Sequence, residues 1–147
     1  MMLLSARDMK RLEGVHADLV SVVRRAFQIW DTQKTGLPLI VTEGVRTLKR
    51  QQELFAMGRT APGKKVTWTM VSRHLTGHAV DIAIIREGKI PNAEDPLWDT
   101  LGECMFDAAK ELQIKIRWGG DWDQAGIAHE RGEGDLVHFE LPASYYP

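Results

Sequence analysis

The amino-acid sequence predicts one α+β domain in which helices pack on a small antiparallel sheet. Three segments space their apolar residues as amphipathic helices do, and four shorter apolar segments have the length of strands. The chain has 147 residues, which fits a single domain with a buried core, and its hydrophobic content of 44% is ordinary for a globular protein. We find no internal repeat or low-complexity tract, so residues 1–147 are predicted to form one unit.

The three predicted helices lie in the first, second and last thirds of the chain. Residues 17–32 carry apolar side chains on one helical face, namely Leu19, Val22, Val23, Ala26, Phe27 and Trp30. A second helix is predicted over residues 48–57, where Gly58 follows, and a third runs from Pro96 to about Leu112.

Four strands are predicted between and after these helices, at residues 39–42, 79–85, 114–118 and 136–141. The segments 58–69 and 119–134 are rich in glycine and polar residues, so both are predicted to be long loops. The sequence pattern leaves the order of the strands in the sheet open.

Charge and cysteine content exclude several functional classes. The formal net charge is −1 and no Lys/Arg-rich tract occurs, so no nucleic-acid partner is expected. The single cysteine, Cys104, excludes an internal disulfide and a Cys-based zinc finger, so a metal would need His and carboxylate ligands. No apolar run has the length of a transmembrane helix or of a secretory signal, and we therefore expect a cytoplasmic protein without a membrane anchor.

The predicted strand at residues 79–85 carries an acidic residue on a face of small residues. Asp81 shares this face with Ala79 and Ala83, and a carboxylate there is costly unless it is paired or binds a metal. A pairing with an arginine, or a turn cap, is the alternative interpretation. His74 lies upstream, and Gly77 between them permits a sharp turn that would bring the imidazole and the carboxylate together.

The last predicted strand adds a second histidine. Strict alternation places Leu136, His138 and Glu140 on one face, with Val137, Phe139 and Leu141 on the other. Two histidines and one carboxylate are typical ligands of a catalytic zinc ion.

His78 is a rival ligand, because it follows His74 by four residues as in the helical two-histidine motifs of zinc proteases. Gly77 argues against a helix there, and Leu75 stands where those motifs have a glutamate, so we exclude His78 from the site.

A family resemblance becomes specific at these residues. The chain contains the pattern Ser72-x-His74-x-x-Gly77-x-Ala79-x-Asp81, followed by Asp135-x-x-His138. This pattern resembles the zinc peptidases that include D-alanyl-D-alanine carboxypeptidases, D-alanyl-D-alanine dipeptidases and L-alanyl-D-glutamate endopeptidases. Further segments that are similar to the family, the last branch above all, are Arg46-Thr47 with Arg50-Gln51, Gly58-Arg59-Thr60, Val66-Thr67-Trp68 and Trp118-Gly119-Gly120-Asp121-Trp122. The similarity spans roughly residues 36–141.

The resemblance implies a role for each matching residue. His74, Asp81 and His138 would bind Zn²⁺ and leave one coordination position open. Asp135 falls on the position of the family's general base, and Arg46 on that of its active-site arginine, which would stabilise an oxyanion or hold a substrate carboxylate. Ser72 and Arg73 would help to bind or orient the substrate.

Two features of the chain do not follow directly from the family pattern. Strict strand alternation places Asp135 on the face opposite His138, so a turn before the strand would have to bring it inward. Glu140 is the alternative base, or a hydrogen-bond partner of an imidazole. The chain also has Glu43-Gly44-Val45-Arg46 where the family usually has Ser-Gly-Tyr-Arg.

Together these features predict a zinc-dependent peptidoglycan endopeptidase that hydrolyses the L-Ala–D-Glu bond of the stem peptide with a metal-activated water. The resemblance further implies a monomeric, phage-type endolysin without a wall-binding module, which stays in the cytoplasm until a holin releases it to the cell wall. The alternatives are a D-alanyl-D-alanine carboxypeptidase or dipeptidase, and a non-catalytic, zinc-stabilised binding domain.

Two further sets of residues carry open alternatives. Tryptophans 68, 118 and 122 would either pack in the interior or stack on substrate. The acidic residues Asp121, Asp123, Glu130 and Glu133 would form a solvated loop or bind a regulatory ion such as calcium.

Overall fold

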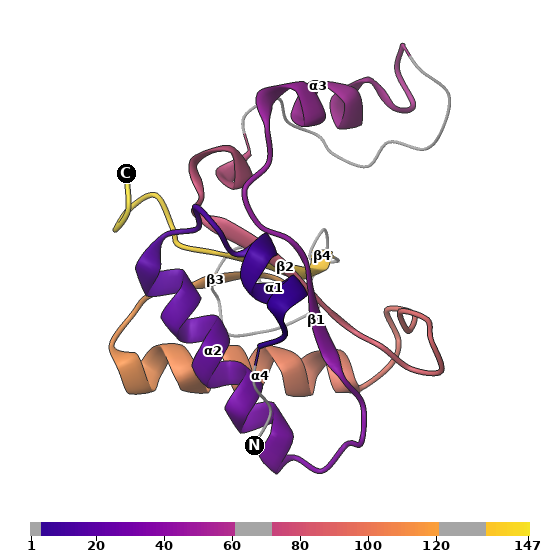
Figure 1. Ribbon diagram of the computed structural model, residues 1–147, viewed down its shortest axis with the longest axis vertical. Coiled ribbons are helices and arrows are strands. Elements are labelled where there is room, and N and C mark those ends of the chain that lie inside the picture. Colours follow the sequence, from indigo (N-terminus) through magenta and orange to yellow (C-terminus); the bar gives the residue numbers. More distant parts are fainter. Residues whose placement is uncertain (1–3, 61–71, 121–134) are drawn as a thin grey trace.

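The computed structural model describes residues 4–60, 72–120 and 135–147, and Figure 1 shows the course of the chain. In chain order the elements are α1 (Ala6–Arg11), α2 (Ala17–Thr32), β1 (Leu39–Glu43), α3 (Leu48–Ala56), the 3₁₀ helix η1 (Arg73–Thr76), β2 (Ala79–Ile84), α4 (Leu97–Leu112), β3 (Arg117–Gly119) and β4 (Asp135–Glu140). The predicted α+β class is confirmed, and the predicted helix at residues 17–32 has the bounds of α2.

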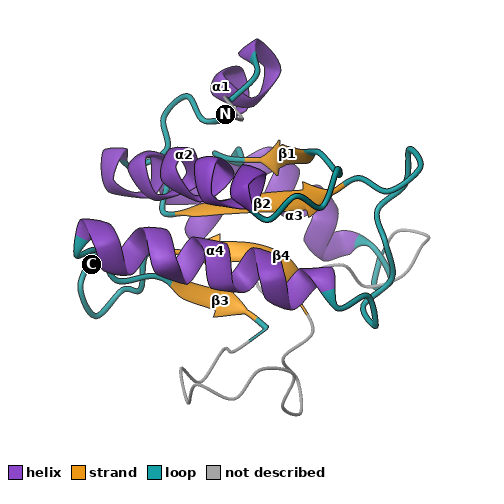
Figure 2. Ribbon diagram, turned by 90° about the horizontal axis from the view of Figure 1, so that it is seen from below, coloured by secondary structure: helices purple, strands orange, loops and turns teal. Residues whose placement is uncertain are grey.

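The four strands form one antiparallel sheet in the order β1-β2-β4-β3. Helices α2 and α4 pack against each other and cover one face of this sheet, as Figure 2 shows from below. Helix α3 lies apart from both, beyond the end of the sheet in Figure 1. The opposite face of β2 and β4 is therefore not covered by α2 or α4, and the candidate site lies on it.

The hydrophobic core fills the space between the two long helices and the sheet. The apolar face of α2 is buried against alternate residues of the central strand, Val80, Ile82 and Ile84. At the β3 side, the indole of Trp118 stacks on Phe139 with ring centroids 6.0 Å apart. Trp118 is thus a packing residue, the first of the two roles that the sequence left open for it.

Helix α1 is an element that the sequence analysis did not predict. It has six residues, too few for an apolar period, and it begins with a capping box between Ser5 and Asp8. Asp8 is buried, and its carboxylate accepts a hydrogen bond from the backbone N–H of Val41 at 2.9 Å. The guanidinium of Arg11 donates to the carbonyl of the same residue at 2.8 Å. Two side chains of α1 therefore pair with the outer edge of β1.

The register of β1 against β2 contains a bulge that reverses the alternation of side chains. Val41 lies opposite Ile82 in the core, and Glu43 lies opposite Asp81, so Thr42 is an extra residue on β1. Directly opposed residues of an antiparallel pair share a face. The bulge thus brings Glu43 to the face of Asp81, although it is only two residues from buried Val41.

A second irregularity lies between β3 and β4, and it corrects the predicted face of Leu136. Trp118 pairs with Phe139, but Gly119 pairs with Asp135. Leu136 belongs to the core together with Phe139, three residues further on, which strict alternation does not allow. The prediction that Leu136 shares a face with His138 was therefore wrong. Asp135, next to Leu136, points to the opposite side, the side of His138.

Two smaller differences concern strand bounds. The predicted strand at residues 114–118 begins only at Arg117, and the last strand already begins at Asp135. Within the residues described, no helix combines the length and the hydropathy that crossing a membrane requires.

Candidate active site

His74 is positioned by a short turn that directly precedes β2. Ser72 caps the 3₁₀ helix η1, and its hydroxyl accepts a hydrogen bond from the backbone N–H of His74 at 3.2 Å. Gly77 ends the helix with a φ of +77°, a backbone conformation that favours glycine. A Cβ atom there would lie 2.4 Å from the carbonyl oxygen of Gly14, so this position excludes any side chain.

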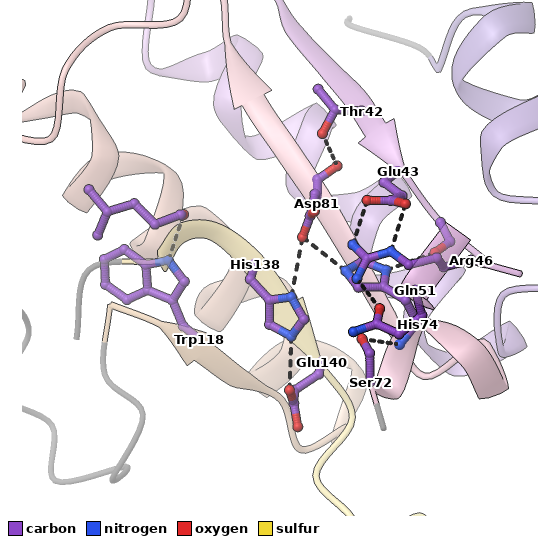
Figure 3. Close-up of polar contacts among 12 residues, drawn as sticks. Thr42, Glu43, Arg46, Gln51, Ser72, His74, Asp81, Trp118, His138 and Glu140 are labelled. Carbon is purple, nitrogen blue, oxygen red and sulfur yellow. Dashed lines mark hydrogen bonds and ion pairs between the residues drawn. The ribbon is translucent and has the colours of Figure 1, made fainter. Parts of the chain in front are cut away.

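Three side chains converge on the face of the sheet that α2 and α4 leave uncovered. His74 comes from η1, Asp81 from β2 and His138 from β4, as Figure 3 shows. The Nε2 atom of His74 and the Nδ1 atom of His138 each lie 3.2 Å from the same Oδ1 atom of Asp81. One ligand atom from each residue lies within 4.8 Å of the others. The structure therefore brings together the three predicted metal ligands.

The remaining ring nitrogens of the two histidines have partners of their own. The Nδ1 of His74 lies 2.7 Å from the carbonyl oxygen of Gly44, which can only accept, so Nδ1 is the donor there and Nε2 is the ring atom that faces Asp81. The Nε2 of His138 lies 2.8 Å from the carboxylate of Glu140. Such partners fix the ring and raise its basicity in metal sites. Glu140 therefore has the contacts of an imidazole partner, one of the two roles left open for it.

The ionisable groups of the cluster shift one another's pKa values. Burial alone would raise the pKa of Asp81, but hydrogen bonds from His138 and His74 outweigh it and hold this pKa well below its usual range. Burial alone would lower the pKa of His138, but its bonds to Asp81 and Glu140 raise it to about 9. Without a metal, these residues form an ion pair around a carboxylate that stays charged.

The donor set fits a zinc ion. Two imidazole nitrogens and one carboxylate oxygen are ligands that Zn²⁺ accepts, and the bond between Nδ1 of His74 and Gly44 leaves Nε2 as the atom of this ring that would bind the metal. Three protein ligands leave a fourth position for water or substrate, as catalytic rather than structural zinc sites do.

Asp135 lies beside the cluster at the beginning of β4. The residue as a whole is exposed, but burial of its carboxyl group raises its pKa, and the charge of Asp81 adds to this rise. The charges of His138, His74 and Arg46 act on it in the opposite direction. Asp135 is therefore within electrostatic reach of the cluster. The predicted turn before the strand was wrong, because Asp135 is the first residue of β4, and the irregular register of β4 brings it to the side of His138 instead.

Arg46 is held on the other side of the cluster. Its Nε and Nη2 atoms donate to the two carboxylate oxygens of Glu43 at 2.8 and 2.6 Å, and its Nη1 donates to the amide oxygen of Gln51 at 2.6 Å. Its backbone N–H donates to the carbonyl of His74 at 3.0 Å. Burial would lower the pKa of Arg46, but Glu43, Asp81 and Asp135 together raise it.

Glu43 and Gln51 are site residues that the sequence analysis did not assign. Gln51 is the one buried residue of α3, an unusual state for a polar side chain on a short helix. The acid at position 43, three residues before the arginine, was noted only as a departure from the family pattern. Its separation of three from Arg46 was the available signal.

The two remaining predicted site residues have contacts within the protein. Ser72 caps η1, as described above, and Arg73 donates from its guanidinium to the backbone carbonyls of Leu141 and Tyr146, at 2.7 and 2.6 Å. These contacts orient the turn that carries His74. A direct contact of Ser72 or Arg73 with substrate stays a prediction.

His78 does not belong to the cluster. Its Nδ1 lies 2.7 Å from the hydroxyl of Thr76, and its ring lies 5.7 Å from that of His16. The prediction that excluded it is consistent with this placement. Trp68, Trp122 and the four acidic loop residues lie outside the described residues.

The fold and the cluster together define a small α+β protein with a two-histidine, one-carboxylate metal centre, and comparisons with known proteins agree. The chain matches the family described as phage L-alanyl-D-glutamate peptidase over residues 1–142. It is 33% identical over 139 residues to the L-alanyl-D-glutamate peptidase of Escherichia phage T5, covering 90% of this chain and 92% of that protein. The chain therefore belongs to the phage L-alanyl-D-glutamate peptidase family.

Other relatives extend the similarity to bacterial proteins. The peptidoglycan L-alanyl-D-glutamate endopeptidase CwlK of Bacillus subtilis is 33% identical over 100 residues, which cover 59% of this chain and 55% of that protein. The crystal structure of the Serratia marcescens L-Ala D-Glu endopeptidase ChiX matches with a TM-score of 0.74 and 33% identity, covering 99% of this chain and 94% of that one. The vancomycin-resistance D,D-pentapeptidase VanY, solved in complex with Zn(II), shares the fold with a TM-score of 0.54 at 19% identity, over 86% of this chain and 72% of that one.

Proposed function

We propose that this protein is a zinc-dependent peptidoglycan endopeptidase that hydrolyses the L-Ala–D-Glu bond of the stem peptide. The convergence of His74, Asp81 and His138, with a further acid beside them, is the observation that carries the proposal. The named activities of the T5, Bacillus and Serratia relatives support the choice of bond.

His74, Asp81 and His138 would hold the zinc ion. When bound, zinc polarises the scissile carbonyl and makes water a better nucleophile at neutral pH. Side chains of the protein transfer the proton and stabilise the developing charge.

Asp135 is the proton carrier in this proposal. Its carboxylate accepts a proton from the attacking water, whose hydroxyl group adds to the carbonyl carbon of L-Ala. The same carboxyl group then gives the proton to the nitrogen of D-Glu as the C–N bond breaks. Burial raises the pKa of Asp135, which suits a group that must both accept and return a proton near neutral pH.

Arg46 stabilises the negative charge that develops on the carbonyl oxygen. Its guanidinium is fixed by Glu43 and Gln51, so little reorganisation is needed when the charge appears.

The setting in which the enzyme acts is proposed on the same grounds. We infer a monomer made in the cytoplasm, which a holin releases to the peptidoglycan of the cell wall. The T5 relative, a phage protein, supports this setting.

The decisive experiment incubates the zinc-loaded protein with purified muropeptides and identifies the new termini by mass spectrometry. We expect free L-Ala carboxyl and D-Glu amino termini. Release of free D-Ala with the L-Ala–D-Glu bond intact would instead indicate a D-alanyl-D-alanine carboxypeptidase. Zinc binding without any hydrolysis would indicate the non-catalytic binding domain.

Asp135→Asn tests the proton carrier. We expect kcat to fall by about 10²- to 10⁴-fold while the zinc content stays that of wild type. Asp107→Asn, on the exposed side of α4, is the matched control and should keep full activity. Equal turnover by Asp135→Asn and wild type would show that another group carries the proton.

A further inference from the structure

We propose that Glu43 is a positioning residue, which holds the Arg46 guanidinium in its working orientation and keeps it away from the acids of the site. This inference rests on the proposed function, because Arg46 acts there on the scissile carbonyl. The two side chains form a two-point ion pair, with Nε and Nη2 of Arg46 at 2.8 and 2.6 Å from the two oxygens of Glu43. The side chain of Arg46 is only 9% exposed, so water competes weakly for these bonds.

The backbone is built to place Glu43 in this position. Without the bulge at Thr42, Glu43 would follow Val41 by regular alternation and face the core. The hydroxyl of Thr42 donates to the carbonyl of Asp81 at 3.3 Å, across the strands at the bulge. Figure 3 shows the result, with Glu43 and Asp81 side by side and Arg46 next to them.

The ion pair fixes which N–H groups of Arg46 remain for the substrate. A guanidinium has five N–H donors. Glu43 takes two of them, and Gln51, from α3, takes a third. Among the described residues, this leaves one donor on Nη1 and one on Nη2 for an oxygen of the substrate. Contacts from β1 and α3 together prevent the group from turning.

The other acids of the site are the reason why Arg46 needs the ion pair with Glu43. The charges of Asp81 and Asp135 both act on the guanidinium. An arginine without its own carboxylate would be drawn toward Asp81, a metal ligand, or toward Asp135, the proton carrier. Glu43 neutralises Arg46 locally, so that Asp81 and Asp135 keep their own functions.

The first test is a set of variants at position 43. We expect Glu43→Ala to lower kcat by about 10- to 100-fold, the scale of a misplaced catalytic group, with KM and zinc stoichiometry unchanged. Glu43→Gln keeps an oxygen acceptor for one N–H and should retain more activity than Glu43→Ala. Glu53→Ala removes an exposed partner of Arg50 on α3 and serves as the matched control.

A double-mutant cycle shows whether Glu43 acts through Arg46. In an Arg46→Ala background, we expect Glu43→Ala to change kcat by less than about twofold, because the residue to be positioned is gone. Losses that multiply in the double variant would overturn the proposal. Wild-type kcat in Glu43→Ala, or loss of zinc in Glu43→Gln, would overturn it as well.

A readout that does not depend on turnover separates this inference from the proposed function. Wild-type protein should show a slowly exchanging Arg46 Nε–H signal by NMR, and Glu43→Ala should lose it. A signal that persists in Glu43→Ala would refute the positioning role, even if the wild-type enzyme hydrolysed no muropeptide. Absence of wild-type turnover alone would contradict only the proposed function.

Discussion

Zinc uptake by this protein should release a proton from His138, and Glu140 should control how much is released. Hydrogen bonds to Asp81 and Glu140 raise the pKa of His138 from 6.5 to about 9. At pH 7, two pH units below that pKa, the metal-free imidazole is protonated in about 99 of 100 molecules. A metal binds only the neutral ring, so each zinc ion that enters must displace about one proton.

The same shift stabilises the metal-free protein over a defined pH range. The folded-state pKa lies above the unfolded value, so the contribution is complete below pH 6.5 and is lost as the pH rises through about 9. A rise of this size corresponds to about 3 kcal/mol of stability. The side chain of His138 is 10% exposed, so screening by solvent reduces this value little. The zinc-loaded protein lacks the protonated ring and should not lose stability over this range.

Isothermal titration calorimetry in two buffers of different ionisation enthalpy measures the protons released. We expect about one proton per zinc at pH 7. The perturbation is Glu140→Gln, which removes one of the two bonds that raise the pKa and should reduce proton release at pH 8. Glu111→Gln, at an exposed ion pair with Arg25, is the control. Zinc binding at pH 7 without proton release, or an unchanged value in Glu140→Gln, would refute this account of the site.

Three further substitutions test how the fold supports the site. Gly77→Ala forces a side chain into a backbone with φ +77°, so we expect about 1–3 kcal/mol of destabilisation in urea unfolding. We also expect weaker zinc binding, because His74 would be displaced. Unchanged zinc affinity would contradict this. Phe139→Ala should cost about 3–5 kcal/mol by the same measurement, since the ring is fully buried. Asp8→Ala leaves the backbone N–H of Val41 without its acceptor and should cost about 1–3 kcal/mol, whereas an unchanged midpoint would show that water replaces the carboxylate.

The parts of the fold that follow a regular period were predictable from sequence. The apolar face of α2 was predicted with the correct bounds, because sixteen residues give several turns over which the period is visible. His74, Asp81 and His138 were predicted as metal ligands from their residue types and from the family resemblance, and the structure brings the three side chains together. A short turn and a strand pair then suffice to join them.

The parts that were missed depend on irregular backbone. Leu136 was placed on the wrong face because a strand that shifts register keeps no constant period, and nothing local in its sequence marks the shift. Glu43 was not assigned for the same reason, since the extra residue at Thr42 becomes visible only against β2. Helix α1 depends on contacts to Val41, thirty residues away, and has no period of its own.

The pairing of α1 with β1 also bears on how copies of the protein meet. An unpaired strand edge invites the addition of a strand from another chain. Here Asp8 accepts from the N–H of Val41, and Arg11 donates to the C=O of the same residue, in the middle of the edge strand β1. The six-residue helix α1 thereby protects this edge of the sheet against pairing with the same edge of another copy, as a further strand would.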